Sequence, residues 1–230
     1  ITFIKLDLSS TQSVKDCINL LSNLLGGSTG KKINYLFCNA GTMLSNNKQT
    51  LQVNYLSHTL FIHLCLKFEL FLNNNKEKTR IIHTSSTMHH KYNNNIKQLY
   101  QFNSLNNLNR QQVYNMTKLQ QIIYSNALQT YHGEQIQSIA VHPGIIHTNF
   151  FKHYLPSWLE QLLLPLWMII STNTKKGAQS SLYAALSPTL NNLGGIYIDN
   201  CQLQQSSYLS THPQIIKQLY LSTKKLNQKQ

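Results

Sequence analysis

The chain has 230 residues, 41% of them hydrophobic, which is enough for one α/β domain with a sizeable apolar core. Twenty lysines and arginines against seven aspartates and glutamates give a formal charge of +13. These few, widely separated carboxylates argue against a paired-carboxylate hydrolase or an acidic metal site. The basic residues are scattered in ones and twos, without the runs of a nucleic-acid surface, so we expect no nucleic-acid partner.

The four cysteines, Cys17, Cys38, Cys65 and Cys201, form no C-x-x-C pair and no zinc-type cluster. We therefore expect reduced core thiols and no metal site, in the cytoplasm or on a cytosol-facing membrane surface. No secretory signal is visible, so the protein is not expected to be secreted. Because the chain starts at Ile1 inside a predicted strand, we expect it to be a fragment.

Short β-branched or aromatic runs alternate with longer helical patterns along the chain. The predicted strands lie at residues 1–8, 33–41, 79–86, 136–144 and 194–200. The predicted helices lie at residues 11–25, 51–72, 111–131 and 174–186. Ser10 or Thr11 can cap the first helix, which Gly26 and Gly27 end.

Strands that alternate with helices of this length indicate βαβ units, and hence a mainly parallel sheet with helices on both faces. In such α/β folds, ligands bind beyond the carboxyl ends of the strands. Three short turns stand at such ends: "CNAG" at 38–41, "TSS" at 84–86 and "HPG" at 142–144. We expect a site to be assembled there.

The most apolar window of the chain is residues 155–170. It is shorter than the roughly 20 residues of a spanning helix and contains Pro156, Glu160 and Pro165. We interpret residues 150–172 as an apolar lid or interfacial surface that allows peripheral membrane contact through 155–170, and not as a transmembrane segment.

Tyr114 and Lys118 are four residues apart in a predicted helix and so share one face. An ammonium beside a phenol lowers the tyrosine pKa, which suits a general acid or base. A lone Y-x-x-x-K arises readily by chance, and an exposed helix turn is the alternative interpretation. The strand-end turns at 39–41, 85–86 and 143–144 favour the chemical interpretation.

In this order and spacing, the motifs resemble those of the short-chain dehydrogenase/reductase family. The matching residues are Asn39, Ala40, Gly41, Asn54, Ser86, Tyr114, Lys118, Pro143 and Gly144. Within the family, "YNMTKLQQIIYSNAL" and "LGGIYIDNC" are most similar to the branch of retinol dehydrogenases and WW-domain-containing oxidoreductases, although no WW domain is present.

The resemblance implies a Rossmann-like, doubly wound sheet in one partial domain, residues 1–230. It also implies an enzyme that interconverts a hydrophobic alcohol and its carbonyl compound, of retinoid, steroid or lipid aldehyde type. The small-molecule substrate would react with NADP or NAD, of which the family branch slightly favours NADP.

The resemblance also implies a role for each catalytic residue. Tyr114 would exchange a proton with the substrate oxygen, and Ser86 would hold that oxygen, with Ser85 as the alternative. Lys118 would lower the pKa of Tyr114 and bind the nicotinamide ribose. Asn54 would support a water that relays protons to the lysine.

The implied cofactor contacts surround this set. Asp7 would contact the adenine, Asn39, Ala40 and Gly41 would line the cleft, and Thr148 would meet the carboxamide. Pro143 and Gly144 would form the last turn of the cofactor site, to which Tyr114 and Lys118 also belong. The flanking histidines are interpreted as surface or supporting groups: His89, His90, His142 and His147.

One part of the family pattern is absent from the sequence. Family members begin with a strand and a T-G-x-x-x-G-x-G turn that cradles the pyrophosphate, and the nine glycines here show no such spacing. Residues 1–8 and 33–41 would be the third and fourth strands, so the first two are lacking. We therefore expect these 230 residues alone to be inactive. The alternative is a truncated, non-catalytic relative that acts as a binding or scaffold module.

Overall fold

The computed structural model of the chain describes residues 1–44, 46–72, 77–103, 105, 107–144 and 174–230. The predicted lid at 150–172, its membrane contact at 155–170, Thr148 and His147 lie outside the described residues.

The centre of the fold is a five-stranded sheet in the order β1-β2-β3-β4-β5. The strands are β1 Tyr35–Cys38, β2 Thr79–Thr84, β3 Ile136–His142, β4 Ile196–Asp199 and β5 Gln202–Gln204. The first four are parallel, as predicted, and β5 is antiparallel to β4. Every residue of β2 and β3 is buried, which is typical of parallel strands covered on both faces.

The predicted helices at 11–25, 111–131 and 174–186 are confirmed, the one at 51–72 is shifted, and two more α-helices follow residue 186 in the described chain. The α-helices are α1 Thr11–Leu25, α2 Asn47–Leu51, α3 Ser57–Lys67, α4 Arg110–His132, α6 Thr174–Leu186, α7 Tyr208–Thr211 and α8 Pro213–Asn227. Ser10 caps α1 by accepting from the Ser13 N–H at 3.2 Å. Gly26 ends α1 with a φ of 85°, which a glycine adopts without strain.

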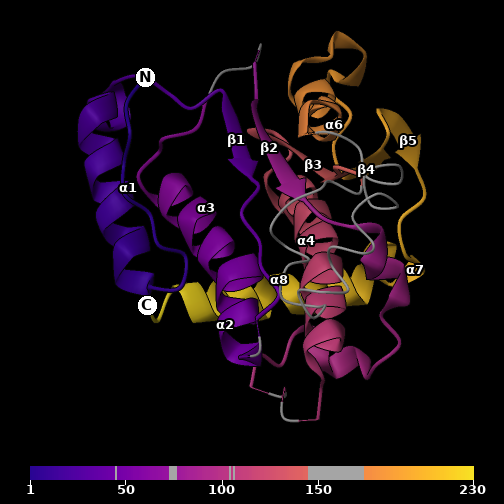
Figure 1. Ribbon diagram of the computed structural model, residues 1–230. Helices are drawn as coiled ribbons and strands as arrows, with labels where there is room; N and C mark the ends of the chain where they lie inside the picture. The colour runs from indigo at the N-terminus through magenta and orange to yellow at the C-terminus, as the bar shows by residue number, and fades with distance from the viewer. Residues whose placement is uncertain (45, 73–76, 104, 106, 145–173) are drawn as a thin grey trace, which may run out of the picture.

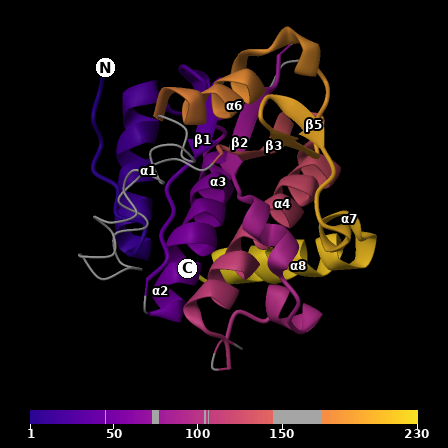
Figure 2. The ribbon, with the colours of Figure 1, turned by 45° about the vertical axis from the view of Figure 1, so that its right-hand side comes forward.

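Helices cover both faces of the sheet (Figures 1 and 2). On one face, α1, α3, α4 and α8 enclose the main core, which includes Ile81 of β2. On the other face, α6 packs Ala184 and Ala185 against Ile82 and Ile139. Ile81 and Ile82 serve different cores because successive side chains of a strand point to opposite faces. The C-terminal helix α8 runs across α3 and α4 (Figure 1) and completes the main core.

The predicted strand at residues 1–8 is not formed, so this prediction was wrong. Residues 1–7 have no helical or strand structure, and the side chains of Ile1 and Phe3 are exposed. Among the described residues, no strand pairs with the outer edge of β1. The segment therefore makes none of the ladder hydrogen bonds that would hold it extended as a strand.

The predicted helix at residues 51–72 begins earlier and ends earlier than expected. It begins with α2, where the Asn46 side chain caps the helix by accepting from the Gln49 N–H. It ends with α3 at Lys67, after which Phe71 forms an isolated parallel bridge with Ile33.

A π-helical turn, Gln52–Leu56, joins α2 to α3. Its signature is the bond from the Ser57 N–H to the carbonyl of Gln52, five residues earlier. Such turns insert one residue into an α-helix and are frequent at functional sites. Asn54 lies in this turn and is fully buried.

Candidate functional site

The carboxyl ends of β1, β2 and β3 lie at one edge of the sheet, and the predicted turns follow them. Residues 39–41 follow β1, Ser85 and Ser86 follow β2, and Pro143 and Gly144 follow β3. The Thr84 hydroxyl donates to Asn39 Oδ1 at 3.2 Å, which links the first two turns directly. The fold therefore brings these three sequence motifs to one place.

Tyr114 and Lys118 lie one turn apart on α4, near its N-terminal end. That end is fixed by a capping box, in which Asn109 and Gln112 each bond the other's main-chain N–H at 2.9 Å. The Lys118 ammonium lies 5.5 Å from the centroid of the Tyr114 ring. Tyr114 is 9% exposed and Lys118 is 3% exposed, so the alternative of an exposed helix turn is wrong.

Neutral oxygen atoms hold the Lys118 ammonium. Its Nζ donates to the main-chain oxygen of Thr84 at 2.8 Å and to Gln121 Oε1 at 3.3 Å. Burial lowers the pKa of Lys118 to about 7, because the charged form loses solvation. The Lys118 side chain can therefore gain or lose a proton near neutral pH.

Asn54 ties the loop after β1 to α4. Its Nδ2 donates to the Thr42 carbonyl at 2.8 Å and to Thr117 Oγ1 at 3.1 Å, while its Oδ1 accepts from the Thr42 N–H at 2.7 Å. Its main-chain oxygen accepts from Gln121 Nε2 at 2.7 Å. The side chain and the main chain of Asn54 thus connect the π-helical turn to the loop after β1 and to α4.

The two serines after β2 have different partners. Ser85 Oγ donates to the main-chain oxygen of Lys118 at 2.7 Å, so its hydroxyl is part of the packing between β2 and α4. Ser86 Oγ accepts from the Met88 N–H at 3.2 Å. In that bond Ser86 acts as an acceptor, which leaves its own hydrogen for another oxygen.

Residue 41 is a glycine where the turn after β1 approaches Lys118. A Cβ at this position would lie 3.2 Å from Lys118 Nζ and 3.5 Å from Asn54 Oδ1, so a side chain would press on both. Asn39, Ala40 and Gly41 are exposed, whereas Lys118 beneath them is buried. A ligand can therefore reach the turn directly above the ammonium.

Three buried histidines lie next to this site; His142 was interpreted as a surface or supporting group, and His58 and His83 were not singled out. His58 contacts the Ala40 carbonyl through Nε2 at 2.9 Å, and burial lowers its pKa to about 4. Burial also lowers the pKa of His83 to about 3 and that of His142, which Asp199 partly offsets. His58 and His83 are thus neutral at neutral pH and add no charge beside Lys118.

Gln121 is a further residue that the sequence reading missed. It is three residues after Lys118 and seven after Tyr114, so all three lie on one helix face. A polar residue at this spacing from the Y-x-x-x-K pair is the signal that could have found it.

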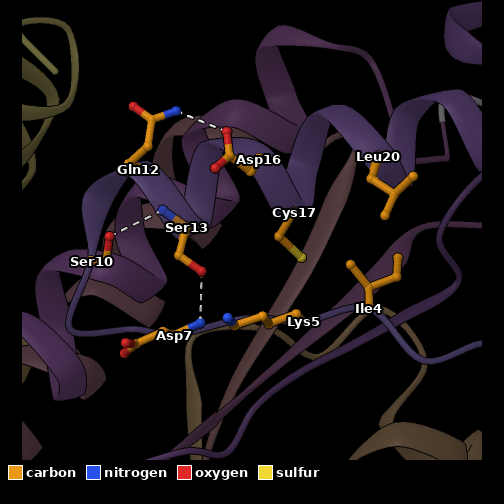
Figure 3. Close-up of a pocket in the computed structure, with 9 residues that line it drawn as sticks. All are labelled: Ile4, Lys5, Asp7, Ser10, Gln12, Ser13, Asp16, Cys17 and Leu20. Carbon is orange, nitrogen blue, oxygen red and sulfur yellow. Dashed lines mark hydrogen bonds between the residues drawn. The ribbon is translucent and has the colours of Figure 1, made fainter.

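The Asp7 carboxylate bonds within its own segment and not to a strand-end residue in the hydrogen bonds of the described chain. It accepts from the N–H and the hydroxyl of Ser9 at 2.8 and 2.7 Å, and these bonds lower its pKa. It borders a hollow of about 440 Å³ between the N-terminal segment and α1 (Figure 3). The segment is anchored to α3 by the Ser57 hydroxyl, which donates to the Leu8 carbonyl at 2.6 Å.

Two further features were sought in the described ranges of the chain. No group of three His, Cys, Asp or Glu side chains there could hold a metal ion. Within the same ranges, no helix combines the length and the apolar character needed to cross a bilayer.

No family model matches the chain. Among curated proteins, it is 28% identical over 233 residues to retinol dehydrogenase 11 of Mus musculus, covering 94% of this chain and 66% of that protein. It is 30% identical over 217 residues to the chloroplastic short-chain dehydrogenase TIC 32 A of Brassica napus, covering 89% and 65%. The chain thus spans just under two thirds of the length of these relatives.

Among solved structures, the fold is similar to that of the NADPH-bound carbonyl reductase from chicken fatty liver. The TM-score is 0.62 at 17% identity, over 89% of this chain and 77% of that chain. The relatives by sequence and the shared fold agree with the motifs at the strand ends. By sequence, the chain is thus related to short-chain dehydrogenases/reductases, and it shares their Rossmann-like fold.

Proposed function

We propose that the chain forms the catalytic part of an NAD(P)-dependent oxidoreductase that interconverts a hydrophobic alcohol and its carbonyl compound. The observation that carries the proposal is the buried Lys118 ammonium 5.5 Å from the Tyr114 ring centroid, on the same face of α4. The names of the relatives, a retinol dehydrogenase among them, support a substrate of retinoid, steroid or lipid aldehyde type.

In this proposal Tyr114 exchanges a proton with the substrate oxygen. Its phenol donates to the carbonyl oxygen during reduction and accepts from the alcohol during oxidation. The Lys118 charge stabilises the phenolate that reduction leaves behind. Ser86 holds the substrate oxygen, and its partners favour it over Ser85, whose hydroxyl is already bonded to α4.

The strand-end residues fit the nicotinamide half of the cofactor. The glycine at 41 allows close approach to Lys118, which would hold the ribose, and Asn39 and Ala40 are exposed beside it. When bound, the nicotinamide supplies or accepts the hydride. The 230 residues contain no glycine-rich turn for the pyrophosphate, so we expect this chain alone to be inactive.

Further cofactor contacts are proposed from the family resemblance. Pro143 and Gly144 would close the site, Thr148 would meet the carboxamide and Asp7 would contact the adenine. Gly144 has a φ of 80°, which fixes this turn in a conformation suited to glycine. We propose NADP in preference to NAD, which the branch and the NADPH-bound structural neighbour support.

We propose that the protein works in the cytoplasm or at a cytosol-facing membrane surface. All four cysteines are free thiols, and three of them are buried. Unpaired thiols support a reducing compartment. Residues 155–170 are the proposed membrane contact, because they are the most apolar window of the sequence.

The test is an assay of NADPH and NADH oxidation by the whole protein, including any residues its gene encodes before Ile1. The substrates are retinal, a steroid ketone and a long-chain aldehyde. We expect turnover of at least one substrate, and Tyr114→Phe to lower kcat about 10²- to 10⁴-fold, because the proton donor is lost. Tyr208→Phe, at an exposed residue of α7, should leave kcat unchanged. No turnover, or an unchanged rate in Tyr114→Phe, would contradict the proposal.

The second candidate is a non-catalytic binding module. It is favoured by the exposed Tyr35 and Phe37, which lie on one face of β1 beside the unpaired edge of the described sheet. Isothermal titration of the 230-residue chain with NADPH separates the two candidates. Micromolar or tighter binding would count against the binding module.

A further inference from the structure

Gln121 joins Lys118 to the π-helical turn that contains Asn54. It is 3% exposed and lies on α4 one turn beyond Lys118. Its Oε1 accepts from Lys118 Nζ at 3.3 Å, and its Nε2 donates to the main-chain oxygen of Asn54 at 2.7 Å. We propose that Gln121 is a positioning residue that holds the Lys118 ammonium against the π-helical turn.

The chemistry of its partners fixes which way the Gln121 amide faces. A main-chain carbonyl such as that of Asn54 can only accept, so it must meet the amide nitrogen. A lysine ammonium can only donate, so it must meet the amide oxygen. The two contacts therefore require the same orientation, and the amide presents an acceptor to Lys118.

An acceptor at this place stabilises the charged form of Lys118. The ammonium has three N–H groups, and the Thr84 carbonyl and Gln121 Oε1 take one each. A hydrogen bond to the charged form of a group favours that form, which opposes the effect of burial. Gln121 thus keeps a larger fraction of Lys118 protonated than burial alone would allow.

The titratable groups near Lys118 are Tyr114 on its own helix, His58 on α3 and His142 at the end of β3, and His83 of β2 interacts with His58. None of these histidines can supply a negative charge. Lys118 lowers the pKa of both His58 and His142, although burial is the larger cause for each. The neutral acceptors around Lys118 therefore take the place of a carboxylate.

The Gln121 amide spans the same two groups as the implied proton path. The family resemblance implies a water between Asn54 and Lys118, whereas here a side chain spans from the Asn54 oxygen to the ammonium. An amide does not exchange protons readily near neutral pH, so Gln121 positions Lys118 and relays no proton. The expected effect of Gln121 on turnover rests on the proposed function. The expected effect of Gln121 on the titration of Lys118 does not.

Gln120 provides a matched control. It is the preceding residue of α4, is fully buried, and donates from Nε2 to the Leu99 carbonyl at 2.8 Å. It is thus the same residue type in the same helix, with a similar bond to a main-chain oxygen. If Gln121 only fills space between helices, the two glutamines should behave alike.

The experiment measures the titration of Lys118 in the 230-residue chain by NMR, with lysine labelled with ¹³C at Cε and the Lys118 signal assigned by Lys118→Arg. We expect Gln121→Met to lower the pKa of Lys118 by about one pH unit, because an acceptor to the charged form is lost. Gln121→Glu should raise it by at least about one pH unit, because a carboxylate then faces the ammonium. Gln120→Met should leave it unchanged.

An unchanged Lys118 titration in folded Gln121→Glu would overturn the inference, as would an equal shift in Gln120→Met. Gln121→Glu preserves the side-chain size, so it carries the test if Gln121→Met does not fold. In the whole protein, Gln121→Met should lower kcat with little change in KM and move the pH–rate profile in the direction of the NMR titration. If the Lys118 titration moves but no variant transfers hydride, the proposed function fails while the positioning role stands.

Discussion

The strand-end side of the molecule and its N-terminal side contain similar apolar sequences that fold differently. "IQSIAVH" forms β3, which pairs with β2 and β4 and is buried along its length. "ITFIKLDL" forms no strand, and Phe3 within it is 92% exposed. The difference shows that a β-branched sequence favours a strand, but that the strand forms only where neighbouring strands pair with it.

The polar groups of the two sides differ in the same way. Lys118, Asn54 and Gln121 are buried and bonded to main-chain oxygens. Asp7 and Ser9 are exposed and bond each other. Buried polar groups need such partners because water cannot reach them, so the strand-end side has one defined arrangement.

The largest effect on the free energy of unfolding is expected from a comparison of two phenylalanines. Phe71 is fully buried in the main core, whereas Phe3 is 92% exposed. We expect Phe71→Ala to lower the free energy of unfolding by about 3–5 kcal/mol, because it removes buried apolar surface and leaves a cavity. Phe3→Ala should change it by less than about 0.5 kcal/mol. Urea unfolding followed by circular dichroism measures both, and equal losses would mean that residues 1–8 are packed in solution.

The next effect is a pH dependence of the strand-end side. Burial lowers the pKa of His83 from 6.5 to about 3, so the unfolded chain binds a proton there that the folded chain does not. The contribution of neutral His83 to the free energy of unfolding is complete above pH 6.5 and is lost as the pH falls towards 3. From pH 7 to pH 5 we expect a loss of roughly 2 kcal/mol from this residue.

Urea unfolding at pH 7 and pH 5 tests this prediction. His83→Gln should show a smaller loss between the two pH values than the unchanged chain, because its side chain does not titrate. The same loss in both proteins would assign the pH dependence to other groups.

The smallest effect concerns the cap of α1 on the N-terminal side. Ser10→Ala should cost about 1 kcal/mol, because the Ser13 N–H loses its side-chain acceptor. The exposed Ser28, in the 3-10 turn after α1, is the control, and Ser28→Ala should change stability by less than about 0.5 kcal/mol. A thermal melt of each variant measures the difference. Equal melting temperatures would show that α1 unfolds separately from the core.

The sequence predicted most elements up to residue 200 and none after it. β5 could not be predicted from burial, because its three residues are all exposed. The helix α8 could have been, since Ile215, Leu219 and Thr223 form a buried stripe at a spacing of four residues. The strand predicted at residues 1–8 was wrong because the sequence of a segment does not show whether another strand will pair with it.

The site was predictable where it depends on strand ends and helix spacing. Parallel strands bring the turns after β1, β2 and β3 together, and the i, i+4 spacing places Tyr114 and Lys118 on one face. The bonds of Asn54 were not predictable from residue types. They depend on the π-helical turn, and the residue types of this segment do not predict such a turn.

That turn also limits how the length of this chain can vary. Gln52–Leu56 contains one residue more than an α-helix needs there, so a single deletion would restore regular helical bonding. The same deletion would rotate α2 by about 100° relative to α3. Thr50 and Leu51 would then leave their buried positions, and Asn47 would lose its 2.6 Å bond to the Leu108 carbonyl. Insertions and deletions are therefore expected before Asn46, and not within the helix that carries Asn54.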